Sequence, residues 1–291
     1  MTEREPKSLQ DLNLVDRFLF DQVMEAPSAY QTTVNILLEN KAVLLEKVQT
    51  EKELRISPKL RAVRLDVVSM DTTGTVYYAE MQKKTTGNLI RRSRYYQGQL
   101  DVSLMEPGSV DFNLLNDTCL ILITPFDLFG RNLYRYTFNG VCEECPDLRI
   151  NDGTVRVFIN TKGTNRDAFT QEFLDFMEYL TDTSDERAAA AESMRIRELH
   201  RVVQKIRASE EMGVKYMQKW EERVYDRMDG KEEGLAEGLA KGLTEGEVKG
   251  KSNINRLIQV LIRDNRLDDL VRSTADPELQ EVLLKEYHIG T

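Results

Sequence analysis

Three polar residues, Asp66, Glu80 and Gln82, stand at a spacing that suits a divalent metal ion. Glu80 and Gln82 are two residues apart in a segment rich in valine and tyrosine, which predicts a strand with both side chains on one face. Asp66 lies in an earlier apolar segment, and the turn Asp71-Thr-Thr-Gly74 predicts a hairpin in which Asp66 falls opposite Glu80. Opposed carboxylates repel each other unless a cation compensates, and Mg²⁺ takes one or two carboxylates while keeping sites for water and phosphate.

A second interpretation is that Asp66 and Glu80 are solvated carboxylates on the open face of this hairpin. The apolar neighbours Val67, Val68 and Val76 argue against it, because they place the hairpin near a core, where an unpaired carboxylate is costly. The spacing alone leaves both interpretations open, since short acid pairs are common in proteins.

Other elements must hold the hairpin in place. Before it, residues 11–54 are expected to form two helices that separate at Pro27 and Ser28, because their apolar residues are three, four or seven apart. The hairpin strands are expected over 62–70 and 75–82, followed by a helix over 89–105, a fully buried strand over 118–124, strands over 133–138 and 155–160, and a helix over 167–180. This order predicts an α/β (α+β) domain with a mixed central sheet.

The composition changes at residue 184, after which aromatic residues are few and Ala, Glu, Lys and Arg are abundant. We therefore expect a folded domain over 1–183, a long helical segment over 184–251 and a small helical domain over 252–291. The long segment carries an internal repeat, a glycine at every fourth residue from Gly230 to Gly250.

The glycine repeat predicts a contact surface between helices. Each glycine inside a helix costs about 1 kcal/mol relative to alanine, so the repeat costs a large part of a domain's stability of about 5–15 kcal/mol. A glycine stripe lets two helix backbones approach closely, which would offset this cost. Upstream, Ile196, Leu199 and Val203 follow heptad spacing. We therefore expect a homodimer or higher homo-oligomer through the C-terminal helices, with a flexible charged linker as the alternative.

Charge and composition restrict the partner and the compartment. The net charge of -9 and the pI near 5.1 argue against a protein whose main role is to coat nucleic acid. Basic residues between Arg55 and Arg94 nevertheless surround the acids of the hairpin, so local contact with phosphates is compatible with the sequence. No window approaches about 18 uncharged apolar residues, and the first residues are polar and of mixed charge. We therefore expect no membrane insertion and a cytoplasmic location.

The order of these segments resembles the PD-(D/E)XK nuclease superfamily, in which acids lie across a hairpin between helices. More narrowly, the chain resembles the Rpn family of recombination-promoting nucleases, also described as transposase-like nucleases. The resemblance spans roughly residues 11–250. It is carried by the segments RLDV from Arg64, YAEMQ from Tyr78, RSRYYQGQLD from Arg92 and CLILITPFDLFG from Cys119, and by the glycine-repeat helix.

The resemblance implies a restriction-endonuclease-like core that hydrolyses phosphodiester bonds in DNA. It implies that Asp66 and Glu80 bind Mg²⁺ or Mn²⁺, with Gln82 at the position usually held by lysine. A neutral amide supplies no charge, so a nearby basic residue is expected to assist, and Arg92 of the next helix is the preferred candidate. A surface phosphate contact or plain solvation is the alternative for Arg92. The superfamily often adds an acid from the first helix, and the candidates Asp16 and Glu39 both remain open.

Two functions remain open from the sequence. The first is a self-associating, metal-dependent DNA endonuclease associated with recombination, mobile elements or phage defence. The second is a catalytically inactive adaptor or assembly protein that keeps the nuclease fold and acts through its C-terminal helices, and the missing lysine supports it. Tyr95 and Tyr96 could stack on bases, but they face different ways along a helix, and at least one is expected in the core.

Overall fold

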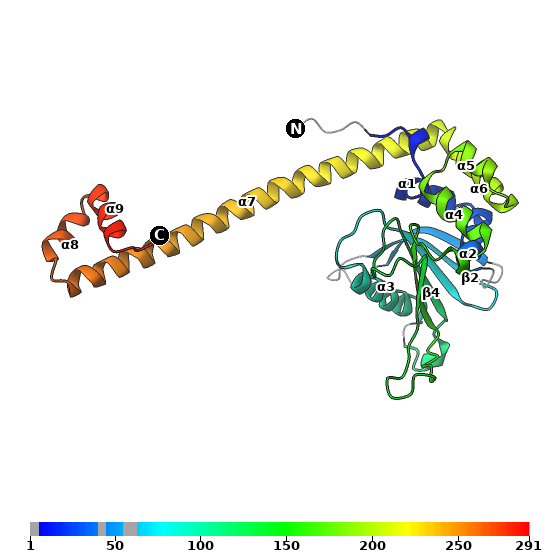
Figure 1. The fold of residues 1–291 in the computed structure, drawn as a ribbon, viewed down its shortest axis with the longest axis horizontal. Coiled ribbons are helices and arrows are strands. Elements are labelled where there is room, and N and C mark those ends of the chain that lie inside the picture. The colour runs from blue at the N-terminus through cyan, green and yellow to red at the C-terminus, as the bar shows by residue number, and fades with distance from the viewer. Residues whose placement is uncertain (1–5, 40–44, 55–62, 107, 291) are drawn as a thin grey trace. The chain divides into compact units, whose positions relative to one another are not determined.

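The computed structural model describes residues 6–39, 45–54, 63–106 and 108–290, and for 45–54 and 63–67 it describes the backbone alone. The chain divides into two compact units, Met1–Met217 and Gln218–Thr291. The first unit contains helices and a sheet, and the second is helical (Figure 1). No helix in these described ranges is long and apolar enough to cross a bilayer. The expected α/β class and the expected long C-terminal helix are confirmed.

A six-stranded mixed sheet lies at the centre of the first unit, in the order β1-β2-β3-β4-β6-β5. The pairs β1–β2, β2–β3 and β5–β6 are antiparallel, whereas β3–β4 and β4–β6 are parallel. The strands are β1 (Leu45–Leu54), β2 (Val63–Asp71), β3 (Val76–Met81), β4 (Thr118–Thr124), β5 (Arg135–Phe138) and β6 (Thr154–Asn160). The expected mixed sheet is therefore confirmed, and the strands expected after the hairpin correspond to β4, β5 and β6.

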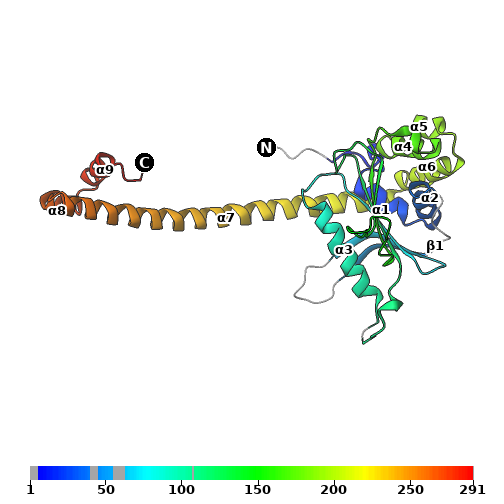
Figure 2. The same cartoon turned by 60° about the horizontal axis from the view of Figure 1, so that its bottom comes forward.

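Helices cover both faces of this sheet (Figure 2). They are α1 (Arg17–Met24), α2 (Pro27–Leu37), α4 (Gln171–Thr181), α5 (Asp185–Ala190) and α6 (Met194–Arg207) on one face and α3 (Leu89–Leu104) on the other. Short 3-10 turns lie at Leu9–Asp11, Phe112–Leu114 and Arg166–Ala168. Pro27 is the first residue of α2, where its missing N–H breaks no helical hydrogen bond, so the expected separation of the first two helices is confirmed.

Strand β3 is buried on both faces, because it lies inside the sheet and between the two helical layers. Tyr77, Ala79 and Met81 face the larger layer and join its core. Tyr78 points the opposite way, into the apolar cluster beneath α3. Glu80 is the next residue on the side of Tyr78 and is 2% exposed. The strand therefore carries a carboxylate into the interior of the protein.

Strands β2 and β3 form the expected hairpin in the expected register. The last residues paired in this register are Val67 and Ala79, and Asp66 and Glu80 follow them along the two strands. Ala62, where the predicted hairpin begins, lies outside the described residues. The backbone thus puts Asp66 and Glu80 at neighbouring positions of adjacent strands.

The carboxylate of Asp71 fixes the turn of the hairpin. Its Oδ1 accepts hydrogen bonds from the Thr73 hydroxyl at 2.7 Å and from the N–H groups of Thr73 and Thr75 at 2.9 Å, and its Oδ2 accepts one from the Tyr77 hydroxyl at 3.1 Å. Burial opposes the ionisation of Asp71, but these hydrogen bonds outweigh it and hold the pKa of Asp71 below its usual value of 3.8. Gly74 completes the turn at φ +86°, a conformation that favours glycine.

The expected helix over residues 45–54 is wrong, since this segment forms β1 and pairs with β2. Its Glu- and Lys-rich sequence favours a helix locally, but β2 offers an edge of unpaired backbone groups, and strand formation depends on such tertiary pairing more than on intrinsic preference. Residues 40–44, which belong to the same expected helix, lie outside the described residues.

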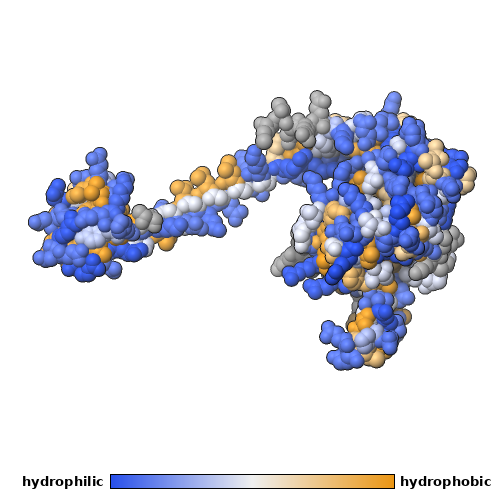
Figure 3. All heavy atoms as spheres, viewed as in Figure 1, coloured by the Kyte–Doolittle hydropathy of each residue, from blue (hydrophilic) through white to orange (hydrophobic). Residues whose placement is uncertain are grey.

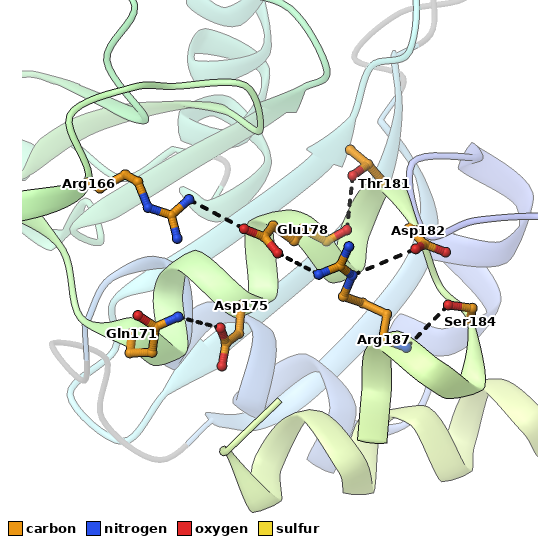
Figure 4. A network of polar contacts seen from close by, with 8 residues as sticks. All are labelled: Arg166, Gln171, Asp175, Glu178, Thr181, Asp182, Ser184 and Arg187. Atoms are coloured by element: carbon orange, nitrogen blue, oxygen red, sulfur yellow. Dashed lines mark hydrogen bonds and ion pairs between the residues drawn. The ribbon is translucent and has the colours of Figure 1, made fainter. Parts of the chain in front are cut away.

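A network of charged side chains fixes the turn between α4 and α5 (Figure 4). Arg187 of α5 donates a hydrogen bond to Glu178 at 2.7 Å and lies 3.7 Å from Asp182, and Arg166 reaches the same Glu178 at 3.3 Å. The Ser184 hydroxyl accepts a hydrogen bond from the Arg187 N–H at 3.3 Å and so caps α5. This turn leads the chain into α6.

Helix α6 belongs to the core of the first unit. Ile196, Leu199 and Val203 are each at most 2% exposed and join the cluster that contains α1 and α2. Their heptad spacing therefore reflects packing onto the first unit. The first turns of α7 (Glu210–Arg263) pack there as well, with the ring of Tyr216 5.0 Å from that of Phe18.

The second unit contains most of α7, followed by α8 (Leu267–Ser273) and α9 (Pro277–Glu286). The end of α7 packs against these two helices around a small core of Leu257, Leu261, Leu283 and Ile289. Pro277 is the first residue of α9, so the short helices expected around this proline are confirmed.

In the middle of α7, every residue from Tyr225 to Gly250 is exposed. Apolar side chains gather along this stretch (Figure 3), and Leu235, Leu239 and Leu243 are 73%, 66% and 64% exposed. Apart from the adjoining residues and backbone of α7 itself, no atom of the described chain lies within 4 Å of the position that a Cβ would take at any glycine of the repeat. Packing within the described chain therefore gives no reason for these glycines.

The hydrogen bonds at Asp71 predict a stability that depends on pH. Because the folded protein lowers the pKa of Asp71, the ionised carboxylate stabilises the hairpin above about pH 4 and loses this effect as the pH falls through the lowered pKa. Asp71→Ala should cost about 1–3 kcal/mol at pH 7, and this difference from the wild type should shrink below pH 4. Urea unfolding between pH 7 and pH 3 measures both quantities.

The matched control is Asp147→Asn in an exposed loop, which should change stability by less than about 0.5 kcal/mol at any of these pH values. A cost of Asp71→Ala that stays constant with pH would contradict the role given to the charge.

Candidate active site

Both oxygen atoms of the buried Glu80 carboxylate are hydrogen bonded. Oε1 accepts a hydrogen bond from Arg92 Nη2 at 2.9 Å, and Oε2 accepts a short one from the hydroxyl of Tyr78. The side chain of Glu80 is 3% exposed and that of Arg92 is 25% exposed. An ionised carboxylate is stable at such a depth because a cation and a hydroxyl donor compensate for the lost water.

Arg92 joins Glu80 to Gln82. Its Nη2 also donates to Gln82 Oε1 at 2.6 Å, while Gln82 Nε2 donates to the carbonyl of Lys84 at 2.7 Å. The guanidinium lies over the ring of Tyr96, 5.5 Å from its centroid. The structure therefore brings together Glu80, Gln82 and Arg92, three of the four expected site residues.

The fourth expected residue, Asp66, lies in β2, but its side chain is outside the described part of the chain. Its backbone position is known from the register of the hairpin, directly after the last pair of β2 and β3. The register thus places the backbone of Asp66 beside that of Glu80 in the adjacent strand.

The donor atoms of this site suit a hard divalent cation. Among the described residues, no three His, Cys, Asp or Glu side chains gather around a common point. The carboxylate of Glu80 and the amide oxygen of Gln82 nevertheless converge on one cationic group, the guanidinium of Arg92. Oxygen donors suit Mg²⁺ and Mn²⁺, and Mg²⁺ needs only one or two carboxylates. The Glu80 carboxylate and the Gln82 amide oxygen are donors that fit such an ion, at the position that the guanidinium occupies.

The acids considered from the first helices form ion pairs elsewhere. Asp16, directly before α1, pairs with Lys83, which points away from Glu80 as the alternation along the strand predicts. Glu39, after α2, pairs with Arg135 of β5 at 2.8 Å. Neither acid contacts Glu80 in the described structure, and both choices stay open for a metal-bound state.

Tyr78 is a site residue that the sequence analysis did not single out. It lies two residues before Glu80, so the same alternation that pairs Glu80 with Gln82 also places Tyr78 on their face. Its ring is fully buried and packs edge-on against Tyr96 at 5.8 Å, which fixes the hydroxyl beside Glu80. Tyr78 therefore acts as a positioning residue for the carboxylate.

No model of a protein family, no curated protein and no solved structure matches this chain. The interpretation of the site therefore depends on its own geometry. That geometry is a buried carboxylate with a guanidinium and a neutral amide around it, beside a strand that carries a second acid.

The Arg92 interaction predicts a defined cost when the guanidinium is removed. Arg92→Gln should destabilise the protein by about 2 kcal/mol in urea unfolding, because Glu80 stays buried with its charge unpaired. The cost is below that of a fully buried pair because Arg92 is partly screened by solvent. Mg²⁺ should raise the melting temperature of this variant more than that of the wild type, because the ion no longer competes with the guanidinium.

Arg91→Gln is the matched control, since Arg91 is exposed on the same helix, and its cost should be below about 0.5 kcal/mol. The double variant Glu80→Gln/Arg92→Gln should recover part of the lost stability and lose the response to Mg²⁺. If Mg²⁺ raised the melting temperatures of the wild type and of Arg92→Gln equally, the ion and the Arg92 guanidinium would not share a position.

Proposed function

We propose that this chain is a metal-dependent DNA endonuclease with a core of the PD-(D/E)XK type. The observation that carries the proposal is the convergence of Glu80, Gln82 and Arg92 on one face of the hairpin, beside the strand that contains Asp66. The arrangement around it also supports the proposal, since the hairpin lies in a mixed sheet with helices on both faces.

Local charge supports a polyanionic substrate. From Gln82 to Leu100 the chain has no acidic residue and carries Lys83, Lys84, Arg91, Arg92 and Arg94. A positive segment raises the local concentration of phosphates even where the net charge of the protein is negative, here -9. The candidate site therefore lies beside the positive segment that a DNA backbone would meet.

Each site residue has a role in this proposal. Asp66 and Glu80 would hold Mg²⁺ or Mn²⁺, which polarises a scissile phosphate and lowers the pKa of a bound water. Gln82 orients a water molecule or a phosphate oxygen through its amide, and Arg92 supplies the positive charge that a lysine would otherwise carry. Tyr78 holds Glu80 in place through its hydroxyl.

A second candidate function is that of a catalytically inactive adaptor or assembly protein. The ion pair itself favours it, because Arg92 donates to the oxygens of both Glu80 and Gln82 and so competes with a metal ion. Incubation of the purified protein with plasmid DNA and Mg²⁺ or Mn²⁺ separates the two functions. Cleavage that EDTA abolishes supports the nuclease, and intact plasmid under all conditions supports the adaptor.

We also propose that α7 joins copies of the chain into a homodimer or higher homo-oligomer. The support is the exposed stretch from Tyr225 to Gly250, where six glycines and exposed leucines have no packing partner within the described chain. Close contact with a second helix would offset the cost of the glycines. We also propose a cytoplasmic location, where the protein would have access to its DNA substrate.

The nuclease proposal predicts that Asp66→Ala and Glu80→Ala each reduce plasmid cleavage by about a thousandfold, because loss of a ligand removes several kcal/mol of transition-state stabilisation. Initial rates of plasmid nicking measure this, with circular dichroism to show that each variant is folded. The control Asp111→Ala removes an exposed acid and should cleave like the wild type. Full activity of both site variants would overturn the site assignment.

The assembly proposal predicts the effect of filling the glycine stripe. Substituting Gly234, Gly238 and Gly242 together by Leu should change the mass measured by light scattering, because bulky side chains keep the partner backbone at a distance and lose the dispersion contacts.

The matched control substitutes Ala236, Ala240 and Thr244 by Leu, which adds side chains to the opposite side of the same turns and should leave the mass unchanged. If the glycine variant keeps the mass of an oligomeric wild type, α7 is a charged spacer and not the interface.

A further inference from the structure

Helix α3 has two faces of different chemistry. Toward the sheet it buries apolar residues such as Leu89 and Leu100. On its outer side lie Arg91, Arg94 and Tyr95, which are all exposed, with Tyr95 40% exposed. Arg94 and Tyr95 follow Arg91 by three and four residues, so both side chains are neighbours of Arg91 on the helix surface.

The guanidinium groups on the outer side are not neutralised within the described structure. Arg92 points inward to Glu80, whereas Arg91 and Arg94 form no ion pair with any other described residue. Phosphate groups are the anions that such exposed guanidinium groups bind best, through paired N–H donors. Arg92, which contacts Glu80, lies between Arg91 and Arg94 in the sequence of α3. A chain of phosphate groups bound to Arg91 and Arg94 would therefore lie within one helical turn of the candidate active site.

The structure separates the two adjacent tyrosines of α3. Tyr96 lies under the guanidinium of Arg92 and packs edge-on against Tyr78, so it belongs to the support of the site. Tyr95 is 40% exposed and lies next to Arg94 on α3, four residues after Arg91. An exposed ring next to positive charges is the combination that binds unpaired nucleotides, since the ring stacks on a base face. In a duplex these faces are covered by neighbouring base pairs.

Gly98 extends this outer face by one turn. A glycine inside a helix costs about 1 kcal/mol relative to alanine. Apart from the adjoining residues and backbone of α3 itself, no atom of the described chain lies within 4 Å of the position that a Cβ would take at Gly98, so packing against other elements does not require glycine there. Glycine is used where a ligand approaches the backbone closely. The missing side chain leaves room beside Tyr95 for a nucleotide.

We propose that the outer face of α3 binds a DNA strand with unpaired nucleotides, with Arg91 and Arg94 on its phosphates and Tyr95 stacked on a base. This names the substrate class of the proposed nuclease and so rests on that function: the site prefers a single strand, or the unpaired part of a duplex, over fully paired DNA. Gln82 and Arg92 are the partly exposed groups of the candidate site that such a strand would meet.

Binding without cleavage tests this inference. Fluorescence anisotropy of the full chain in EDTA compares a labelled single strand of about 16 nucleotides with the same sequence as a duplex. The single strand should bind more tightly. Tyr95→Ala should weaken its binding about 5- to 100-fold, and Tyr95→Phe should leave it unchanged, because stacking needs the ring and not the hydroxyl.

The arginines give a second, independent readout. Arg91→Ala and Arg94→Ala should each weaken the binding of single strand and duplex alike and lower the dependence of log K on log salt by about 0.7–0.9 per lost phosphate contact. Two controls lie elsewhere on the surface: Phe112→Ala removes a ring that is 70% exposed, and Arg131→Ala removes an exposed guanidinium. Both should bind like the wild type.

Three results would overturn the inference: tighter binding of the duplex, equal binding by Tyr95→Ala and the wild type, or tighter binding of an RNA strand of the same sequence. Failure of the nuclease function is distinguishable, because the binding assay in EDTA requires no metal ion and no cleavage. A protein that binds single strands through Tyr95 but never cuts them keeps this surface and loses only the catalytic proposal.

Discussion

The charge of Glu80, buried inside the sheet, is the constraint on which the arrangement of the site depends. A carboxylate that is 2% exposed needs a cation and hydrogen-bond donors, and Arg92 and Tyr78 provide them. Arg92 can reach Glu80 only if the side of α3 that carries Arg92 faces the sheet. The same rotation leaves Arg91 and Tyr95 exposed, so the pairing of one buried charge also determines which side chains of α3 are exposed to solvent.

The neutral Gln82 is compatible with this guanidinium in a way that lysine is not. An amide has an acceptor oxygen, and Gln82 Oε1 accepts a hydrogen bond from Arg92 at 2.6 Å. A lysine has no acceptor and would add a second positive charge beside Arg92. The neutral Gln82 and the inward arginine therefore form one arrangement, in which the positive charge beside Glu80 comes from α3 and not from β3.

The residue patterns of the two units differ in whether contacts within the described chain explain them. The first unit includes α6 in its own core, so the heptad spacing of Ile196, Leu199 and Val203 is explained by contacts within the chain. Among the described residues, the repeat from Gly230 to Gly250 has no such explanation, since a Cβ at its glycines would meet no other element within 4 Å and its leucines are exposed. These residues are costly in a helix and have no packing partner among the described residues, and the proposed assembly through α7 depends on this observation.

The sequence by itself determined the features that depend on local chemistry. Alternating apolar residues and the turn from Asp71 to Gly74 set the hairpin register, because both act within a few residues. Only the tertiary structure decided that residues 45–54 form a strand, because the edge of β2 provides their partners. It also decided the direction of Arg92, since the rotation of α3 about its axis depends on packing against strands distant in sequence.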